Sequence, residues 1–222
     1  LEPKEQLIFD QMIDKVKKVY LRHGFMPLDT PVLELSEILL AKSGGEIDKE
    51  VYRFNKGDTD ICMRYDLTVP LARFVAMHSE TLHYPFKRYQ VGKVYRGERA
   101  QKGRFREFVQ CDADIIGNGE LSLVADAECL KMVDEVFEAL NLEIVNQISN
   151  RNILFGFIEG LGYGEIEKQI LTILDKINKI GKDNAREELA KIAVKEKDID
   201  SLLKIIEKRG NFDKILAETE QL

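Results

Sequence analysis

The sequence predicts an α+β fold, with a mixed, mainly antiparallel sheet flanked by helices and an all-helical region after it. Residues 86–117 alternate apolar and polar side chains on both sides of a polar loop, which is typical of a long β-hairpin. Residues 3–22 and 120–140 instead carry apolar side chains at helical spacing. From about Ser149 onward only the helical spacing recurs. We therefore expect two domains, residues 1–148 and 149–222.

In the first half, a helix is predicted over Pro3–Arg22, because proline suits the first turn of a helix and Gly24 can cap its end. Pro27 and Pro31 exclude a helix from residues 25–35 and predict an extended segment there. The elements expected next are a short helix at 36–41 that ends at Ser43–Gly45, two strands at 51–54 and 61–64 around the turn 55–58, and a helix at 68–78.

The second half is predicted to begin with the hairpin, whose strands at 86–96 and 104–117 enclose a polar loop. A helix at 120–140 and a short strand at 143–147 are expected next. In the tail we expect helices at 166–180, 183–193 and 200–209, with the glycine-rich segment 160–164 interpreted as a loop between helices.

Composition agrees with a folded, globular chain. The 222 residues are 44% hydrophobic and 32% charged, which excludes a disordered tail or a collagen-like chain. No stretch approaches the roughly 18 uncharged apolar residues of a membrane helix, and the first residues lack the pattern of a signal peptide. Three scattered cysteines without metal-ligand spacing predict a reducing, cytoplasmic compartment, with neither a disulfide framework nor a metal site.

Charge is unevenly distributed along this acidic chain. The net charge is −6, yet residues 87–106 hold eight basic side chains and one acidic one, and residues 107–135 hold eight acidic and one basic. A basic block of this kind is either a solvated surface loop or a site for a polyanion such as nucleotide phosphates or RNA. Because the sequence has neither a GxxxxGK[ST] loop nor a GxGxxG turn after a strand, a nucleotide site would have to be built from side chains on the hairpin.

Three segments carry a combined pattern: GFMPLDTPVLE at 24–34, MRYDLTVPLAR at 63–73 and the basic hairpin at 94–114. The hairpin segment resembles motif 2 of class II aminoacyl-tRNA synthetases, and the whole chain is similar to the front part of the histidyl branch of that family. The first segment resembles motif 1, with Pro31 as its proline. The second resembles the strand-to-helix turn that binds histidine in this branch.

The resemblance implies a class II synthetase-type fold and a ligase activity. ATP, with Mg²⁺, would activate L-histidine to histidyl-adenylate, and the histidyl group would pass to the 3′ end of tRNA(His). Arg96 would be the catalytic residue, in contact with the α-phosphate and the amino-acid carboxylate. The implied ATP-binding residues are Arg96, Glu98, Arg104 and Phe108, and the implied histidine-binding residues are Asp66, Thr68, Arg96, Gln110 and Asp114. The tRNA acceptor end would meet Arg99, Gln101 and Lys102, and a homodimer would form around Pro31.

The chemistry of these residue types agrees with the resemblance. Fixed guanidinium groups stabilise the charge that builds on phosphoryl oxygens during activation. Phe108 can stack on adenine, while Glu98 can accept from the adenine amino group. The even-numbered positions from Arg104 to Asp114 should share one strand face, so two carboxylates there can recognise a cation or a donor ring. The family can carry Glu where this chain has Asp66 and Asp114, so the pocket geometry should differ by one methylene.

Several family features are missing from these residues: the RGLDYY-type segment, motif 3 and the anticodon-binding domain. We therefore expect residues 1–148 to be a partial catalytic domain, inactive alone and with an exposed sheet edge, and residues 149–222 to be a helical insertion. An alternative is a non-catalytic relative, either a regulatory subunit of ATP phosphoribosyltransferase or a tRNA-sensing domain. The intact set of ATP residues favours the enzyme. A general RNA-binding module fits poorly with the negative net charge.

Overall fold

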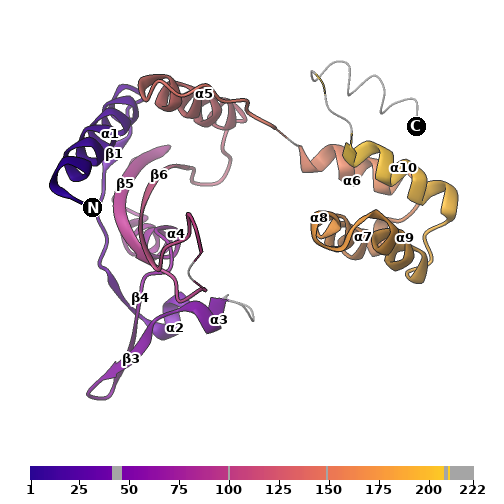
Figure 1. Ribbon diagram of the computed structural model, residues 1–222, viewed down its shortest axis with the longest axis horizontal. Helices are drawn as coiled ribbons and strands as arrows, with labels where there is room; N and C mark the ends of the chain where they lie inside the picture. The colour runs from indigo at the N-terminus through magenta and orange to yellow at the C-terminus, as the bar shows by residue number, and fades with distance from the viewer. Residues whose placement is uncertain (42–46, 100, 149, 208–209, 211–222) are drawn as a thin grey trace. The chain divides into compact units, whose positions relative to one another are not determined.

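The computed structural model describes residues 1–41, 47–99, 101–148, 150–207 and 210. The chain divides into two compact units, Leu1–Asn146 and Gln147–Leu222 (Figure 1). Within the described residues, no helix combines the length and the apolar character needed to cross a membrane.

The first unit is built on two three-stranded sheets. In one sheet, β1 (Met26–Pro27) runs parallel to β5 (Phe86–Tyr95), and β5 pairs antiparallel with β6 (Glu107–Ile116). The antiparallel strands of the other sheet are, in spatial order, β2 (Leu33–Leu35), β4 (Thr59–Met63) and β3 (Arg53–Lys56). The structure therefore confirms a mixed, mainly antiparallel α+β architecture.

Five helices of this unit lie among the described residues: α1 (Pro3–Arg22), α2 (Ser36–Leu39), α3 (Ile47–Glu50), α4 (Thr68–His78) and α5 (Val124–Ala139). Helix α1 begins with proline in its first turn and a capping box between Glu2 and Glu5, and it ends just before Gly24. Helices α1 and α4 have the bounds predicted from the sequence. The predicted end of the short helix at Ser43–Gly45 lies outside the described residues.

The hairpin of β5 and β6 has two faces of opposite character, because successive side chains of a strand point to opposite sides. Its odd-numbered side chains, including Tyr89, Val91 and Cys111, pack against Tyr20 of α1 and Met132 of α5. Helix α4 lies on the even-numbered face, where Phe74 stacks on Phe86 with 6.4 Å between ring centroids. Figure 1 shows α1 and α5 close together and α4 on the other side of the two strands. The apolar core is thus on one face, and the other face carries polar groups.

The second unit is helical throughout its described residues. Its elements are α6 (Arg151–Gly160), a 3₁₀ turn (Gly164–Ile166), α7 (Glu167–Asp175), α8 (Ile177–Ile180), α9 (Lys182–Lys191) and α10 (Glu196–Glu207). The side chain of Asn150 caps α6 by accepting from the backbone N of Asn152 at 2.9 Å. Ile158, Ile170, Leu189 and Leu202 are fully buried in its core.

Several predicted elements differ from the structure. Residues 143–147 do not form a strand: residues 141–148 are exposed, and they pair with no strand among the described residues. An alternating pattern cannot form a strand without a neighbour to accept its hydrogen bonds. The predicted helix at 166–180 is divided into a 3₁₀ turn and two α-helices. Helix α5 begins at Val124, four residues later than predicted.

Candidate active site

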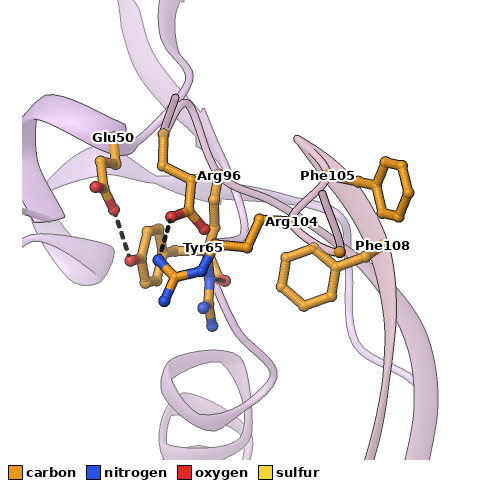
Figure 2. A pocket seen from close by; sticks show the side chains of 8 residues that line it. Glu50, Tyr65, Arg96, Arg104, Phe105 and Phe108 are labelled. Atoms are coloured by element: carbon orange, nitrogen blue, oxygen red, sulfur yellow. Dashed lines mark hydrogen bonds and ion pairs between the residues drawn. The ribbon is translucent and has the colours of Figure 1, made fainter. Parts of the chain in front are cut away.

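A pocket of about 460 Å³ lies at the end of the hairpin where β5 leaves the sheet and β6 enters it. It is lined by Glu50, Tyr65, Arg96, Glu98, Gly103, Arg104, Phe105 and Phe108. Figure 2 shows Arg96, Arg104 and Phe108 gathered around this space, with the Phe105 ring to one side. The four residues predicted to bind ATP therefore all line one pocket, although they come from both sides of the hairpin loop.

The guanidinium group of Arg96 lies between two aromatic rings. Its central carbon is 4.4 Å from the Tyr65 ring centroid and 5.1 Å from that of Phe108. Its Nε donates to the backbone O of Tyr65 at 3.2 Å. Cation–π contacts of this kind contribute about 0.5–2 kcal/mol each. In the described part of the chain no carboxylate forms a salt bridge with Arg96, so its positive charge is available to an anionic ligand.

Glu50 and Tyr65 are two pocket residues that the sequence did not single out for a role. The Tyr65 hydroxyl donates to Oε2 of Glu50 at 2.8 Å (Figure 2). The backbone N of Gly97 donates to the backbone O of Glu50 at 2.6 Å. Burial and the bond to the Glu50 carboxylate raise the pKa of Tyr65. A Cβ atom at Gly97 would lie 2.9 Å from the Glu50 carbonyl, so only glycine allows this approach. Tyr65 stood inside a recognised segment, whereas no sequence signal pointed to Glu50.

Glu98 and Arg104 form an ion pair, with Nη1 of Arg104 3.1 Å from Oε2 of Glu98. Arg104 lies in the turn before β6 and not on the strand, which corrects the prediction that it starts the return strand. The physical reason is a tight turn: Gln101 and Arg104 exchange backbone hydrogen bonds of 3.3 and 2.9 Å, and Gly103 has φ of +80°.

The remaining even-numbered side chains of β6 line the polar face as predicted. In the strand register, Phe108 pairs with Val94, and the next partners along this face are Gln110 with Gly92, Asp112 with Gln90 and Asp114 with Arg88. Two buried acceptor atoms on this face, Oε1 of Gln110 and Oδ2 of Asp114, have no hydrogen-bond partner among the described residues. Unsatisfied buried acceptors are costly to a folded protein and call for a ligand or solvent that donates to them.

The carboxyl groups on this face have altered acidity. Burial raises the pKa of Asp112, the Arg88 guanidinium opposes that rise, and the charges of Asp114 and Asp66 add to it. Burial likewise raises the pKa of Asp114, again opposed by Arg88. A cation near these carboxylates would favour their charged forms.

Asp66 and Thr68 lie at the start of α4. One oxygen of Asp66, Oδ1, accepts from the backbone N of Thr68 at 3.0 Å and of Val69 at 3.1 Å, so it satisfies the first N–H groups of the helix. The Thr68 side chain is exposed. Asp66 therefore has a local structural role besides any contact with a ligand.

A buried arginine joins the segment around Pro31 to the hairpin. Arg64 donates from Nε to the backbone O of Lys93 at 2.7 Å and from Nη1 to the backbone O of Thr30 at 2.6 Å. A Cβ atom at Gly92 would lie 2.6 Å from Arg64 Nη2, so a larger residue there would displace this hydrogen-bonded side chain. Pro31 itself is exposed and lines neither the pocket nor the polar face.

The loop residues predicted to contact tRNA are also apart from the pocket lining. Arg99, Gln101 and Lys102 are exposed, and Ala100 between them lies outside the described residues. Gln101 is held by its backbone bonds to Arg104.

A hairpin with helices on one face and an arginine-lined pocket on the other, beside a small antiparallel sheet, defines the class II aminoacyl-tRNA synthetase fold. Pyrrolysyl-tRNA synthetase from Desulfitobacterium hafniense shares this fold, with a TM-score of 0.55 over 65% of this chain and 51% of its own, at 19% identity. The family model described as histidyl-tRNA synthetase matches residues 1–222, and the chain belongs to that family.

Relatives agree with this membership. The chain is 48% identical to the histidine–tRNA ligase of Clostridium tetani and 45% identical to that of Finegoldia magna, covering all of this chain but 51% and 52% of theirs. The crystal structure of histidyl-tRNA synthetase from Nostoc sp. PCC 7120 matches with a TM-score of 0.84 at 33% identity, over 98% of this chain and 49% of that one. The chain thus spans about half the length of the relatives it matches.

A second solved structure has the same fold at lower identity. It is described as an ATP phosphoribosyltransferase regulatory subunit/histidyl-tRNA synthetase from Bacillus halodurans C, with a TM-score of 0.77 and 20% identity over 99% of this chain and 56% of that one. At this identity the likeness concerns the fold alone.

Proposed function

We propose that this chain carries the ATP-binding and amino-acid-binding surfaces of a histidine–tRNA ligase. The observation that carries the proposal is the even-numbered face of the hairpin, which joins an arginine-lined pocket to a row of polar side chains, some of whose buried atoms make no hydrogen bond within the described residues. In the reaction, the histidine carboxylate attacks the α-phosphorus of ATP. A bond forms between them, the bond to the β-phosphate breaks, and pyrophosphate leaves.

Arg96 is the proposed catalytic residue. Its guanidinium is held by two aromatic rings and the Tyr65 carbonyl, and it has no salt-bridge partner among the described residues, so it can stabilise charge on the phosphoryl oxygens and the attacking carboxylate. A fixed cation lowers the barrier because it need not reorganise when the charge develops.

The other proposed ATP contacts surround it. Phe108 would stack on adenine, which contributes about 1 kcal/mol. Glu98 would accept from the adenine amino group, and Arg104 would bind the γ-phosphate end. Glu98 and Arg104 pair with each other in this structure, so binding of ATP would replace their ion pair by one ligand contact for each residue. Mg²⁺ would neutralise charge on the phosphates when bound. Because Mg²⁺ is usually bound through substrate phosphates and only one or two carboxylates, we propose that it enters with the nucleotide.

The proposed histidine site is the continuation of the same face, with Gln110 and Asp114 on β6 and Asp66 and Thr68 at the start of α4. Oε1 of Gln110 and Oδ2 of Asp114 accept no hydrogen bond from the described residues, although Asp114 is ion-paired with Arg88, and both atoms suit the donors of histidine, which are an ammonium group and a ring N–H. Arg96 would meet the substrate carboxylate at the pocket end. The substrate would then lie along the strand direction, with its carboxylate at Arg96 and its ammonium group and ring toward Gln110 and Asp114.

The wider assembly is proposed by analogy with the family. We propose that residues 1–148 form part of the catalytic domain and 149–222 a helical insertion, that Arg99, Gln101 and Lys102 approach the acceptor end of tRNA(His), and that a homodimer forms around Pro31 in the cytoplasm. Exposed Met26, Leu33 and Leu35 near that proline support a covered surface there.

Histidine-dependent exchange of pyrophosphate into ATP tests the proposal. We expect the complete gene product that contains this chain to exchange with histidine and with no other amino acid, and we expect the 222-residue chain alone to be inactive. Absence of exchange by the complete gene product would instead favour the regulatory alternative, for which the likeness to the Bacillus halodurans protein provides the fold.

A further inference from the structure

The polar face of the hairpin contains a completely buried arginine that the proposed reaction does not use. Arg88 has an exposed fraction of 0% and faces Asp114 across the strand register. Its Nη2 atom lies 2.7 Å from Oδ2 of Asp114 and donates to the backbone O of Leu67 at 3.3 Å. Leu67 stands between Asp66 and Thr68, so Arg88 touches both elements that carry the proposed histidine site.

The contacts of Arg88 do not suit a group kept for stability alone. Its Nε and Nη1 atoms are buried and have no hydrogen-bond partner among the described residues. The contact with Asp114 is a close ion pair, and that carboxylate oxygen accepts no hydrogen bond within the described residues. A guanidinium buried this completely, with two of its donor atoms unsatisfied, costs desolvation that an apolar side chain of the same volume would avoid. Its value must therefore lie in what it holds in position.

We propose that Arg88 is a positioning residue for recognition of the amino-acid substrate. Its guanidinium bridges the Asp114 carboxylate of β6 and the Leu67 carbonyl at the start of α4. This bridge fixes the spacing between Asp114 and the two residues that flank Leu67, Asp66 and Thr68. The inference rests on the proposed function, because it concerns the same site.

Charge gives Arg88 a second effect on the same site. The charges of Asp66 and Asp114 act on Asp112 and are opposed there by Arg88 and Arg96, and Arg88 is also the cation that acts on Asp114. Arg88 offsets part of the negative charge of these carboxylates, while Arg96 keeps its charge for the anionic groups of the substrates. Without Arg88, the carboxylates repel one another more strongly and spread apart. Both effects concern the amino acid and leave the ATP pocket, at the other end of the hairpin, unchanged.

The test compares Arg88→Met with a matched control in the complete gene product. Methionine keeps much of the volume of the side chain and removes its charge. Lys87→Met is the control: Lys87 is the preceding residue of β5, points to the opposite face and pairs with Glu128 at 2.6 Å. Binding of L-histidine alone is measured by calorimetry, and the KM values for histidine and ATP are measured by pyrophosphate exchange.

We expect Arg88→Met to weaken histidine binding about tenfold or more, as loss of a group supporting a primary ligand does, while the KM for ATP stays within about twofold. Lys87→Met should change neither. An Arg88→Met protein that binds histidine like the unmodified protein, or that loses histidine and ATP affinity equally, would overturn the inference. If the unmodified protein itself neither binds nor activates histidine, the proposed function is what fails.

A double-mutant cycle shows whether Arg88 acts through Asp114. Asp114→Asn should weaken histidine binding, and adding Arg88→Met should weaken it little further, because the group that Arg88 positions is already lost. Fully additive losses would contradict the inference. If Arg88→Met does not fold, Arg88→Lys takes its place in the same comparison, since lysine keeps the charge but cannot reach Asp114 and Leu67 together. Selective loss of histidine affinity supports the inference, and unchanged or unselective affinity overturns it.

Discussion

The two faces of the β5–β6 hairpin share a backbone but differ in how fully their side chains are satisfied. On the odd-numbered face, apolar groups pack between α1 and α5, and the Tyr20 hydroxyl donates to the backbone O of Cys111 at 2.9 Å. On the even-numbered face, Arg88, Gln110 and Asp114 hold buried polar atoms with no hydrogen-bond partner in the described part of the chain. One face stabilises the domain, and the other keeps polar groups available at some cost to stability.

The largest expected effect comes from the apolar face. Phe25 is fully buried in the cluster below the odd-numbered side chains, and Phe25→Ala should lower the free energy of unfolding by about 3–5 kcal/mol because it leaves a cavity.

Gln110→Leu, on the polar face, should change stability little while weakening histidine binding, because leucine removes an unsatisfied group. Urea denaturation measures both, and equal destabilisation by the two substitutions would erase the contrast between the faces.

Arg96 should show the opposite behaviour to Phe25. Arg96→Met should lower the histidine-dependent exchange rate by roughly 10²–10³-fold, because a preorganised charge next to the reacting groups is lost. The melting temperature should fall only modestly, because Arg96→Met removes the two cation–π contacts and the bond to the Tyr65 carbonyl but leaves no cavity in the core. Arg22→Met is the control: its ion pair with Glu135 is on the surface, and its loss should leave exchange unchanged. A large fall in melting temperature for Arg96→Met would instead indicate a structural role.

A smaller effect is expected at Tyr65, which connects the polar face to α3. Tyr65→Phe keeps the ring under Arg96 and removes the bond to Glu50. The activation free energy of the exchange reaction should therefore rise by about 0.5–1.5 kcal/mol, the contribution of one hydrogen bond. Tyr65→Leu also removes the aromatic ring and should weaken it further. Steady-state exchange measurements distinguish the two variants, and equal rates would show that the ring contributes nothing to holding Arg96.

The smallest effect is a dependence of stability on pH. Burial, together with Asp114 and Asp66, raises the pKa of Asp112 against the opposing charge of Arg88. A carboxyl whose pKa is raised on folding favours the native state below its ordinary pKa of about 3.9, and this contribution is lost as the pH rises through the raised value. Asp112→Asn should therefore stabilise the fold at pH 7 and make no difference near pH 3. Denaturation at both pH values measures this, and an equal gain at both would point to a cause other than charge.

Much of the fold followed from local patterns. Periodicity and prolines predicted α1, α4 and the hairpin, because these elements carry strong alternating or helical patterns. The strand at 143–147 was wrong, because pairing requires a neighbour that no local pattern reveals. Arg104 was placed on the strand for a similar reason: the turn with Gln101 forms only once the loop closes.

The sequence by itself determined the family and the residues that carry its motifs, because their types and spacing are written along the chain. Alternation along β6 also determined that Gln110, Asp112 and Asp114 share a face. Only the tertiary structure decided that Glu50 supports Tyr65, that Arg96 lies between two rings, and that Arg88 is buried against both Asp114 and Leu67. These contacts join residues 12 to 31 positions apart in the sequence, and they form only when the strands, α3 and the start of α4 pack together, which local pattern does not encode.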